Sequence, residues 1–216
     1  FVPAVFLKPM TEDLGWSRGF FSSVVWLSTL ISIPVAIYLW PMVDRRGARE
    51  VMIVSGILMG IGTMGLSLVQ EKWHFVLIKS VIIPFGTMGL GPMMAMLVVS
   101  NWFIKRRGRV LAWTAMGMSA GGIAAPPLLT YLIAEFGWRQ AWLVSGLAAL
   151  VLTVVPAALF MKRRPEDMGL LPDGETQVSR DNRKEKPAPP QEATWTRREI
   201  LRTSAFWLAA IAHPLG

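Results

Sequence analysis

The segment 44–50, Asp-Arg-Arg-Gly-Ala-Arg-Glu, holds five charged side chains in seven residues. No charged residue occurs in the stretches on either side of it, 19–43 and 51–70. Because a helix dipole favours an acid near the N-terminus by about 0.3–1 kcal/mol, we expect Asp44 to lie at the start of the helix that follows. Gly47 permits a tight turn between two antiparallel helices. The residues alone predict a charged turn between two apolar helices.

The sequence offers little for catalysis. It contains no cysteine, which excludes a disulfide framework and thiolate metal sites. The two histidines, His74 and His213, lie far apart in the sequence. No paired-histidine metal motif, phosphate-binding loop or nucleophile-elbow motif is present. The sequence therefore indicates no enzyme, no cofactor and no metal site.

The elements that hold these residues are long and apolar. Five stretches without a charged residue have lengths of 25, 20, 25, 25 and 22 residues. A helix needs about 20 apolar residues to cross a bilayer core, whereas helices of soluble proteins average about 11–12 residues. We therefore predict an all-α, polytopic transmembrane helix bundle. Helices 2 to 6 are expected at about 20–40, 51–69, 75–101, 110–134 and 140–161.

The two ends of the chain differ from this pattern. Residues 1–7 are apolar but too few to span, and we interpret them as the end of helix 1, followed by a loop over 8–19. Residues 162–202 hold ten basic and eight acidic residues, a composition that cannot bury a core. We predict a transmembrane part over 1–161, a cytoplasmic linker over 162–202, and the truncated start of helix 7 over 203–216.

Lysine and arginine are distributed unevenly between the two sides of the predicted spans. Ten lie on one side, in 45–49, 105–109 and 162–164, and four lie on the other. Since the basic side faces the cytoplasm, the loops between helices 2 and 3, 4 and 5, and 6 and 7 are expected to be cytoplasmic, in a plasma or inner membrane. The net charge of +8 then serves topology and lipid headgroups, not nucleic acid. Six tryptophans near helix ends are interpreted as anchors at the membrane surface: Trp16, Trp40, Trp73, Trp102, Trp138 and Trp142.

The loop between helices 2 and 3 resembles the signature of the major facilitator superfamily, which is Gly, three residues, Asp, Arg or Lys, any residue, Gly and then basic residues. Four positions match it: Asp44, Arg45, Gly47 and Arg49. Trp40 stands where the first Gly is usual, and Ala48 where a basic residue is usual. The order of six helices, a long charged linker and a further helix is similar to the N-terminal half of that fold.

Three other segments resemble one branch of that superfamily, the monocarboxylate and oxalate:formate porters. They are FLKPMTEDLGWSRG after helix 1, GTMGLGPMMAMLVVSNWFIKRRG from helix 4 into the next loop, and FGWRQAW at the start of helix 6. The pattern in the loop after helix 4 is typical of these porters: Trp102, Phe103, Arg106, Arg107 and Gly108. The resemblance covers essentially the whole chain and implies a twelve-helix parent.

Lys79 is the only charged residue inside a predicted span. An intramembrane lysine is costly and indicates a functional site. It lies about a turn inside the outer end, so its side chain can also snorkel to the surface. Both alternatives stay open: a snorkelling lysine, or one that attracts an anionic substrate.

Glycine and proline interrupt two of the predicted helices. Helix 4 carries Pro84, Gly86, Gly89, Gly91 and Pro92, and helix 5 carries Gly117, Gly121, Gly122, Pro126 and Pro127. Glycines allow close helix packing and prolines free backbone carbonyls. Such interruptions occur near binding sites in transporters, but packing alone accounts for any one glycine equally well. For helix 5 the residues favour packing, with a hinge as the alternative.

His213 precedes Pro214, about ten residues into the predicted helix 7. Helix 7 lines the central cavity in the resembled family, and histidine titrates near physiological pH. His213 is therefore a candidate for a substrate or proton contact. The alternative is a histidine that hydrogen-bonds a carbonyl freed by the proline.

The resemblance implies a secondary active transporter that moves a small organic anion, such as a monocarboxylate, by proton symport or anion exchange. Its partners would be the lipid bilayer, the anion, a proton or counter-anion, and the missing C-terminal half of the same chain. In the family the loop signature pairs across the interface between halves and stabilises the state open to the outside. From the residues alone, its arginines could simply set topology.

Two other functions stay open. One is a major facilitator exporter of drugs or metabolites, although Ala125-Pro126-Pro127 is a poor copy of the Gly-Pro signature of such exporters in helix 5. The other is a membrane sensor or scaffold on a transporter fold that transports nothing.

Overall fold

The computed structural model describes residues 2–103 and 106–161. Every regular element in these ranges is a helix, which confirms the all-α prediction. The chain divides into two units, Phe1–Gln177 and Val178–Gly216, and the described residues all belong to the first. The predicted linker 162–202, the predicted helix start 203–216 and His213 lie outside the described residues.

The first three helices are α1 (Val2–Leu14), α2 (Arg18–Arg46) and α3 (Ala48–Gly65), the last continued by a 3-10 turn at Leu66–Leu68. The predicted loop over 8–19 is too long, because residues 8–14 belong to α1. Ser17 sets the start of α2, since its Oγ accepts a hydrogen bond from the N–H of Phe20 at 3.2 Å.

The predicted helix 4 is a composite of four pieces. These are α4 (Lys72–Leu77), a π-helical stretch (Ile78–Ile82), α5 (Ile83–Leu90) and α6 (Pro92–Trp102). Together they form one candidate membrane span, Lys72–Trp102. Gly91, with extended ψ of 175°, separates α5 from α6.

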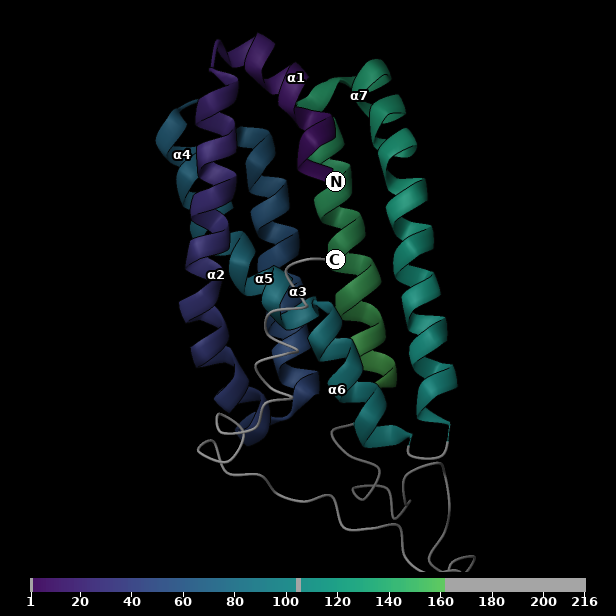
Figure 1. The fold of residues 1–216 in the computed structure, drawn as a ribbon. Coiled ribbons are helices and arrows are strands. Elements are labelled where there is room, and N and C mark those ends of the chain that lie inside the picture. The colour runs from purple at the N-terminus through teal and green to yellow at the C-terminus, as the bar shows by residue number, and fades with distance from the viewer. Residues whose placement is uncertain (1, 104–105, 162–216) are drawn as a thin grey trace, which may run out of the picture. The chain divides into compact units, whose positions relative to one another are not determined.

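The last element, α7 (Arg107–Phe160), contains two of the predicted helices. Gly137 interrupts it with φ 81° and ψ 162°, outside the helical region. The span Arg107–Leu159 has 53 residues, about 80 Å of helix, more than twice a bilayer core of about 30 Å. Figure 1 shows α7 rising along one side of the bundle and returning beside α3. The arms 107–136 and 138–160 therefore correspond to the predicted helices 5 and 6.

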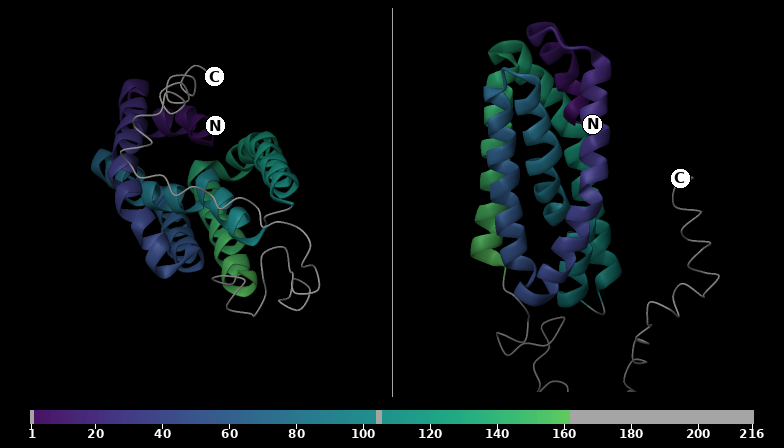
Figure 2. Two further views of the ribbon diagram at one scale, coloured as in Figure 1. Left: turned by 60° about the horizontal axis from the view of Figure 1, so that its bottom comes forward. Right: turned by 90° about the vertical axis from the view of Figure 1, so that its left-hand side faces the viewer.

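Small residues bring α3 close to its two neighbours, α5 and the second arm of α7. A Cβ added to Gly60 would lie 2.7 Å from Leu150 Cβ, and one added to Gly86 would lie 2.6 Å from Met59 Cβ. A Cβ on Gly146 would lie 2.6 Å from the backbone N of Met64. These glycines let three helices approach almost backbone to backbone, in the antiparallel bundle that Figure 2 shows from two further sides.

An aromatic cluster holds the end of the bundle where α1 lies. Phe6 of α1 stacks on Trp142 of α7 with ring centroids 3.7 Å apart, and Trp16 packs against Phe75. Trp16, Trp138 and Trp142 are buried in this cluster. The interpretation of these three tryptophans as membrane-surface anchors is therefore wrong, because they pack inside the protein. Trp73, by contrast, is exposed.

The outer faces of the helices are apolar as well. Large apolar side chains such as Trp26, Ile37 and Leu152 are exposed, and soluble proteins rarely expose contiguous apolar patches on such a scale. Four helical segments of the described residues are long and apolar enough to cross a membrane. Both observations fit a bundle that is surrounded by lipid.

Candidate functional site

The charged segment 44–50 forms a turn of a single residue between α2 and α3. Gly47 has φ 89° and ψ 158°, and its N–H donates to the carbonyl oxygen of Val43 at 2.8 Å. Such a backbone is open to glycine and strained for other residues. The predicted tight turn is therefore confirmed, and it aligns the ends of two membrane helices.

The position of Asp44 differs from the expectation. Asp44 belongs to the last turn of α2 and not to the start of α3, because α2 continues to the residue before Gly47. The acid in the first turn of α3 is Glu50, where the helix dipole favours it. The dipole argument therefore applies to Glu50 and not to Asp44.

Arg49 connects this turn to the far end of the described chain. Its Nη2 donates a hydrogen bond to the carbonyl oxygen of Ala158, in the last turn of α7, at 2.8 Å. Carbonyls at a helix C-terminus lack intrahelical donors and carry partial negative charge, so a guanidinium stabilises them. This pairing could not be predicted from the sequence, since 109 residues separate the two partners.

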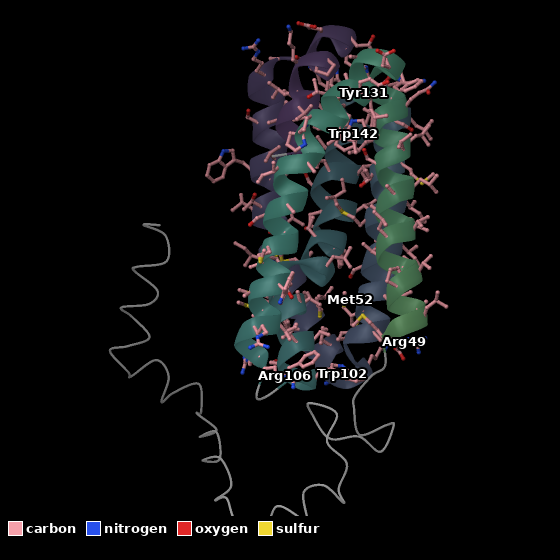
Figure 3. All side chains as sticks on the ribbon, turned by 90° about the vertical axis from the view of Figure 1, so that its right-hand side faces the viewer. Arg49, Met52, Trp102, Arg106, Tyr131 and Trp142 are labelled. Carbon is pink, nitrogen blue, oxygen red and sulfur yellow. The ribbon has the colours of Figure 1, made fainter. Side chains whose placement is uncertain are left out.

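The loop after α6, which carries the Trp102 to Gly108 pattern, lies at the same end of the bundle. Figure 3 labels Arg49, Trp102 and Arg106 at one end and Tyr131 and Trp142 toward the other. The N–H of Phe103 donates to the carbonyl oxygen of Val99 at 2.9 Å and closes α6. Three exposed residues of the pattern follow: Arg106, which caps α7, then Arg107 and Gly108 in its first turn.

Lys79 lies in the π-helical stretch Ile78–Ile82, seven residues after the start of α4, about 10 Å along the helix. Stretches of π-helix are frequent at functional sites. The next residue, Ser80, is buried, and its Oγ donates to the carbonyl oxygen of Val24 on α2 at 3.3 Å. A Cβ on Gly62 of α3 would lie 2.9 Å from Ile82 Cγ2. Neighbours of Lys79 thus fix this stretch between α2 and α3.

Lys79 shares a helix face with two buried residues. Residues four positions apart share a helix face, and Phe75 and Ile83, on either side of Lys79, both belong to the buried core. Exposed apolar residues of this helix, Leu77 and Val81, occupy other positions around it. Lys79 itself is half-buried. The two alternatives for Lys79, a snorkelling lysine and one that attracts an anionic substrate, both stay predictions.

The interrupted part of helix 4 packs against α3. Gly86 lies against Met59, and Gly89 lies against Ser55. Pro84 is buried at the start of α5. Gly91 then breaks the helix, and its carbonyl oxygen accepts from the N–H of Met94 at 3.0 Å to start α6. Close packing accounts for Gly86 and Gly89, whereas Gly91 is a backbone discontinuity inside a span.

The small residues of helix 5 have a different setting. A Cβ added to Gly117, Gly121 or Gly122 would meet no atom within 4 Å. This face of the arm 107–136 is therefore unpacked within the part of the chain that the structure describes. Pro126 is half-buried further along, and its carbonyl oxygen accepts from Thr130 Oγ1 at 2.9 Å.

At the opposite end, Asp13 joins α1 to the bend of α7. One carboxylate oxygen, Oδ2, accepts from Trp138 Nε1 at 3.1 Å and from Arg139 Nη1 at 3.0 Å. The Arg139 guanidinium also lies over the Trp138 ring, 4.3 Å from its centroid. We call these three residues the outer clasp. Sequence reasoning did not connect Asp13 with Trp138 and Arg139.

Comparison with known proteins decides the family. Residues 1–215 match the Major Facilitator Superfamily. The chain belongs to this superfamily. The resemblance to this superfamily that the sequence showed is thereby confirmed. Within residues 2–103 and 106–161, no group of three or more potential metal ligands comes together.

Several transporters of the Major Facilitator Superfamily are distantly similar to the chain. Human "Monocarboxylate transporter 14" is 30% identical over 161 residues, which is 73% of this chain and 31% of the relative. "Riboflavin transporter MCH5" of Saccharomyces cerevisiae is 28% identical, over 76% of this chain and 32% of the relative. "Fujikurins efflux protein" of Gibberella fujikuroi is 30% identical, over 71% of this chain and 33% of the relative. The chain spans about a third of the length of these curated relatives.

Proposed function

We propose that this chain is part of a secondary active transporter of small organic anions, of the monocarboxylate type, driven by proton symport or anion exchange. The observation that carries the proposal is Lys79, a lysine in a membrane span that shares a helix face with the buried Phe75 and Ile83. A cation kept at such a position is costly unless it meets a negative partner. The carboxylate of a substrate would supply that partner, and the name of the human relative fits this chemistry.

The break at Gly91 supports the same function. Discontinuous membrane helices form substrate sites in transporters because their free backbone groups point into a cavity. Lys79 and Gly91 belong to one composite span, Lys72–Trp102. We assign this span to the substrate pathway, together with His213 as a second substrate or proton contact.

The turn at Gly47 supports alternating access. It holds the ends of α2 and α3 at a fixed separation, and Arg49 joins them to the last turn of α7. A rigid end of this kind can rock as one body. We propose that Asp44 and Arg45 make and break contacts with the missing C-terminal half, at a basic end that faces the cytoplasm.

The unpacked face of helix 5 completes this arrangement. Gly117, Gly121 and Gly122 leave room for a close helix contact. The missing half of the same chain would provide that helix, and the small residues would let the two halves slide as the transporter changes state.

Uptake of a labelled monocarboxylate into proteoliposomes that contain the full-length protein tests the proposal. Lys79→Gln should raise KM for the anion by about tenfold or more, because one charge-assisted contact is lost, and Lys79→Arg should restore part of it. The matched control is Lys72→Gln, at the exposed start of α4. If Lys79→Gln takes up the anion with the same KM as the wild type, Lys79 does not bind the anion.

Export of a neutral or hydrophobic metabolite is the second candidate. It is favoured by the names of two relatives, a fujikurins efflux protein and a riboflavin transporter. In that case the full-length protein should transport such a compound while monocarboxylate uptake stays at background.

A further inference from the structure

A hollow of about 230 Å³ lies between α2, α3 and α5, and the proposed transport function does not use it. Tyr38 and Met42 line it from α2, Val54 and Leu58 from α3, and Phe85 from α5. Its walls are almost wholly apolar. The hollow is therefore unsuited to a small anion and suited to hydrocarbon.

The hollow is closed at its base and open at its side. Val51 and Ser55 lie at its base, and their exposed fractions are only 1% and 2%. At its rim Tyr38 is 79% exposed and Val54 is 46% exposed. Since α2, α3 and the composite span that contains α5 are each apolar enough to cross a membrane, the open side faces the medium around the helices. In a bilayer that medium is acyl chains.

A cation lies at the lower end of the same helix face. Arg46 is exposed and follows Met42 by four residues and Tyr38 by eight, so the three share one face of α2. Eight residues of helix measure about 12 Å. One leaflet of the hydrocarbon core is about 15 Å thick, so this distance fits within it. An acyl chain whose phosphate lies at Arg46 would thus reach the hollow within one leaflet.

The opposite wall contributes charge of the other sign. Glu50 precedes Val54 by four residues on α3 and is exposed. Below the hollow, the end of α2 and the start of α3 therefore carry an exposed guanidinium, which can bind a phosphate, and an exposed carboxylate, which disfavours a second negative group. This combination favours a phospholipid with a single negative group over a polyanionic headgroup.

We propose that the hollow is a specific site for one acyl chain of a membrane phospholipid, with the phosphate of that lipid bound by Arg46. The lipid fills the space between α2, α3 and α5. This inference concerns the wall of the bundle, so it holds whether or not the transported compound is an organic anion.

Photocrosslinking on the full-length protein tests the proposal. The probe is a singly charged phospholipid with a diazirine in the middle of one acyl chain, added to delipidated protein in nanodiscs, and crosslinks are mapped by peptide mass spectrometry. Crosslinks should concentrate on Tyr38, Val54 and Phe85. Val54→Trp should lower the crosslinks about tenfold, because the larger side chain displaces about two methylene groups of the acyl chain from the hollow. Arg46→Gln should lower them about fivefold.

Matched controls separate a site from general lipid contact. Ile61→Trp is a similar change at an exposed position of α3 outside the hollow, and Arg18→Gln removes a charge at the other end of α2. Both should leave the crosslinks unchanged. Met42→Trp fills the hollow from α2 and serves if Val54→Trp does not fold.

Two results would overturn the proposal. Crosslinks spread evenly over exposed apolar residues, and insensitive to both tryptophan variants, would mean an ordinary lipid layer. Crosslinks at Ile61 with none in the hollow would mean that another part of the protein covers it.

Discussion

Asp13, near the end of α1, binds Arg139, just after the bend of α7, with 3.0 Å between Oδ2 and Nη1. The same oxygen accepts from Trp138 Nε1. Both charged side chains are 47% exposed, so solvent screens the ion pair and its Coulomb energy is small. Its contribution is mainly geometric, because it fixes α1 against the bend of α7 beside the aromatic cluster.

Asp13→Ala removes both hydrogen bonds of the outer clasp, whereas Asp13→Asn keeps an acceptor for Trp138 and loses only the charge. We expect Asp13→Ala to lower Tm by about 2–4 °C, since roughly 1 kcal/mol is at stake in a chain of this size, and Asp13→Asn by less. Thermal unfolding in detergent, followed by tryptophan fluorescence, measures it. Glu12→Ala is the control, because Glu12 forms an exposed pair with Lys8. Equal shifts for Glu12→Ala and Asp13→Ala would count against the clasp.

Gly47→Ala tests the turn between α2 and α3. A Cβ at φ 89° and ψ 158° is strained, and we expect a loss of about 1–3 kcal/mol in stability. Gly108→Ala is the matched control, because its added Cβ would meet open space at an ordinary φ. Tm and the yield of monodisperse protein should fall only for Gly47→Ala. Normal yield and Tm in that variant would mean that the turn relaxes freely.

Gly146→Ala tests the contact between α3 and the second arm of α7. Its Cβ would lie 2.6 Å from the backbone N of Met64, and backbone cannot move aside as a side chain can. We expect about 1–3 kcal/mol of destabilisation from overpacking, visible as a lower Tm. The comparison variant is Gly108→Ala, where no atom lies within 4 Å. An unchanged Tm for Gly146→Ala would show that the two helices separate easily.

Asp44→Asn tests the proposed gate. Transport by the full-length protein should fall several-fold, while the amount of protein in the membrane stays the same, because the change removes a charge and almost no volume. Arg49→Gln should instead lower Tm as well, since it also loses the hydrogen bond to Ala158. Uptake assays together with surface-expression measurements distinguish the two. Wild-type transport by Asp44→Asn would exclude a gating role for that residue.

Hydropathy and charge predicted the class and nearly all the spans, because a bilayer demands long apolar helices whatever their partners are. The limits of helix 3 were predicted within a few residues, since the charges of 44–50 and 71–72 mark both ends. Helix 1 was predicted too short, because Lys8, Pro9 and Glu12 suggested a loop, yet all lie within α1.

Contacts between distant segments were beyond sequence reasoning. Nothing in the order of residues pairs Asp13 with Arg139 or Arg49 with Ala158, since each pair meets only when the helices pack. The π-helical stretch at Lys79 has no sequence signal of its own either. Trp16, Trp138 and Trp142 were interpreted wrongly, because an indole near a helix end suits both a headgroup layer and an aromatic core.

The single-residue turns at Gly47 and Gly137 also restrict proteolysis, antibody binding and tag insertion at these two loops. Neither turn offers the extended stretch of backbone that a protease needs to cleave or an antibody needs to grip. An epitope tag inserted at either glycine would separate two helices whose spacing that glycine sets. Experiments that map sidedness should therefore use single cysteines, introduced at exposed positions beside these turns into a chain that has none of its own.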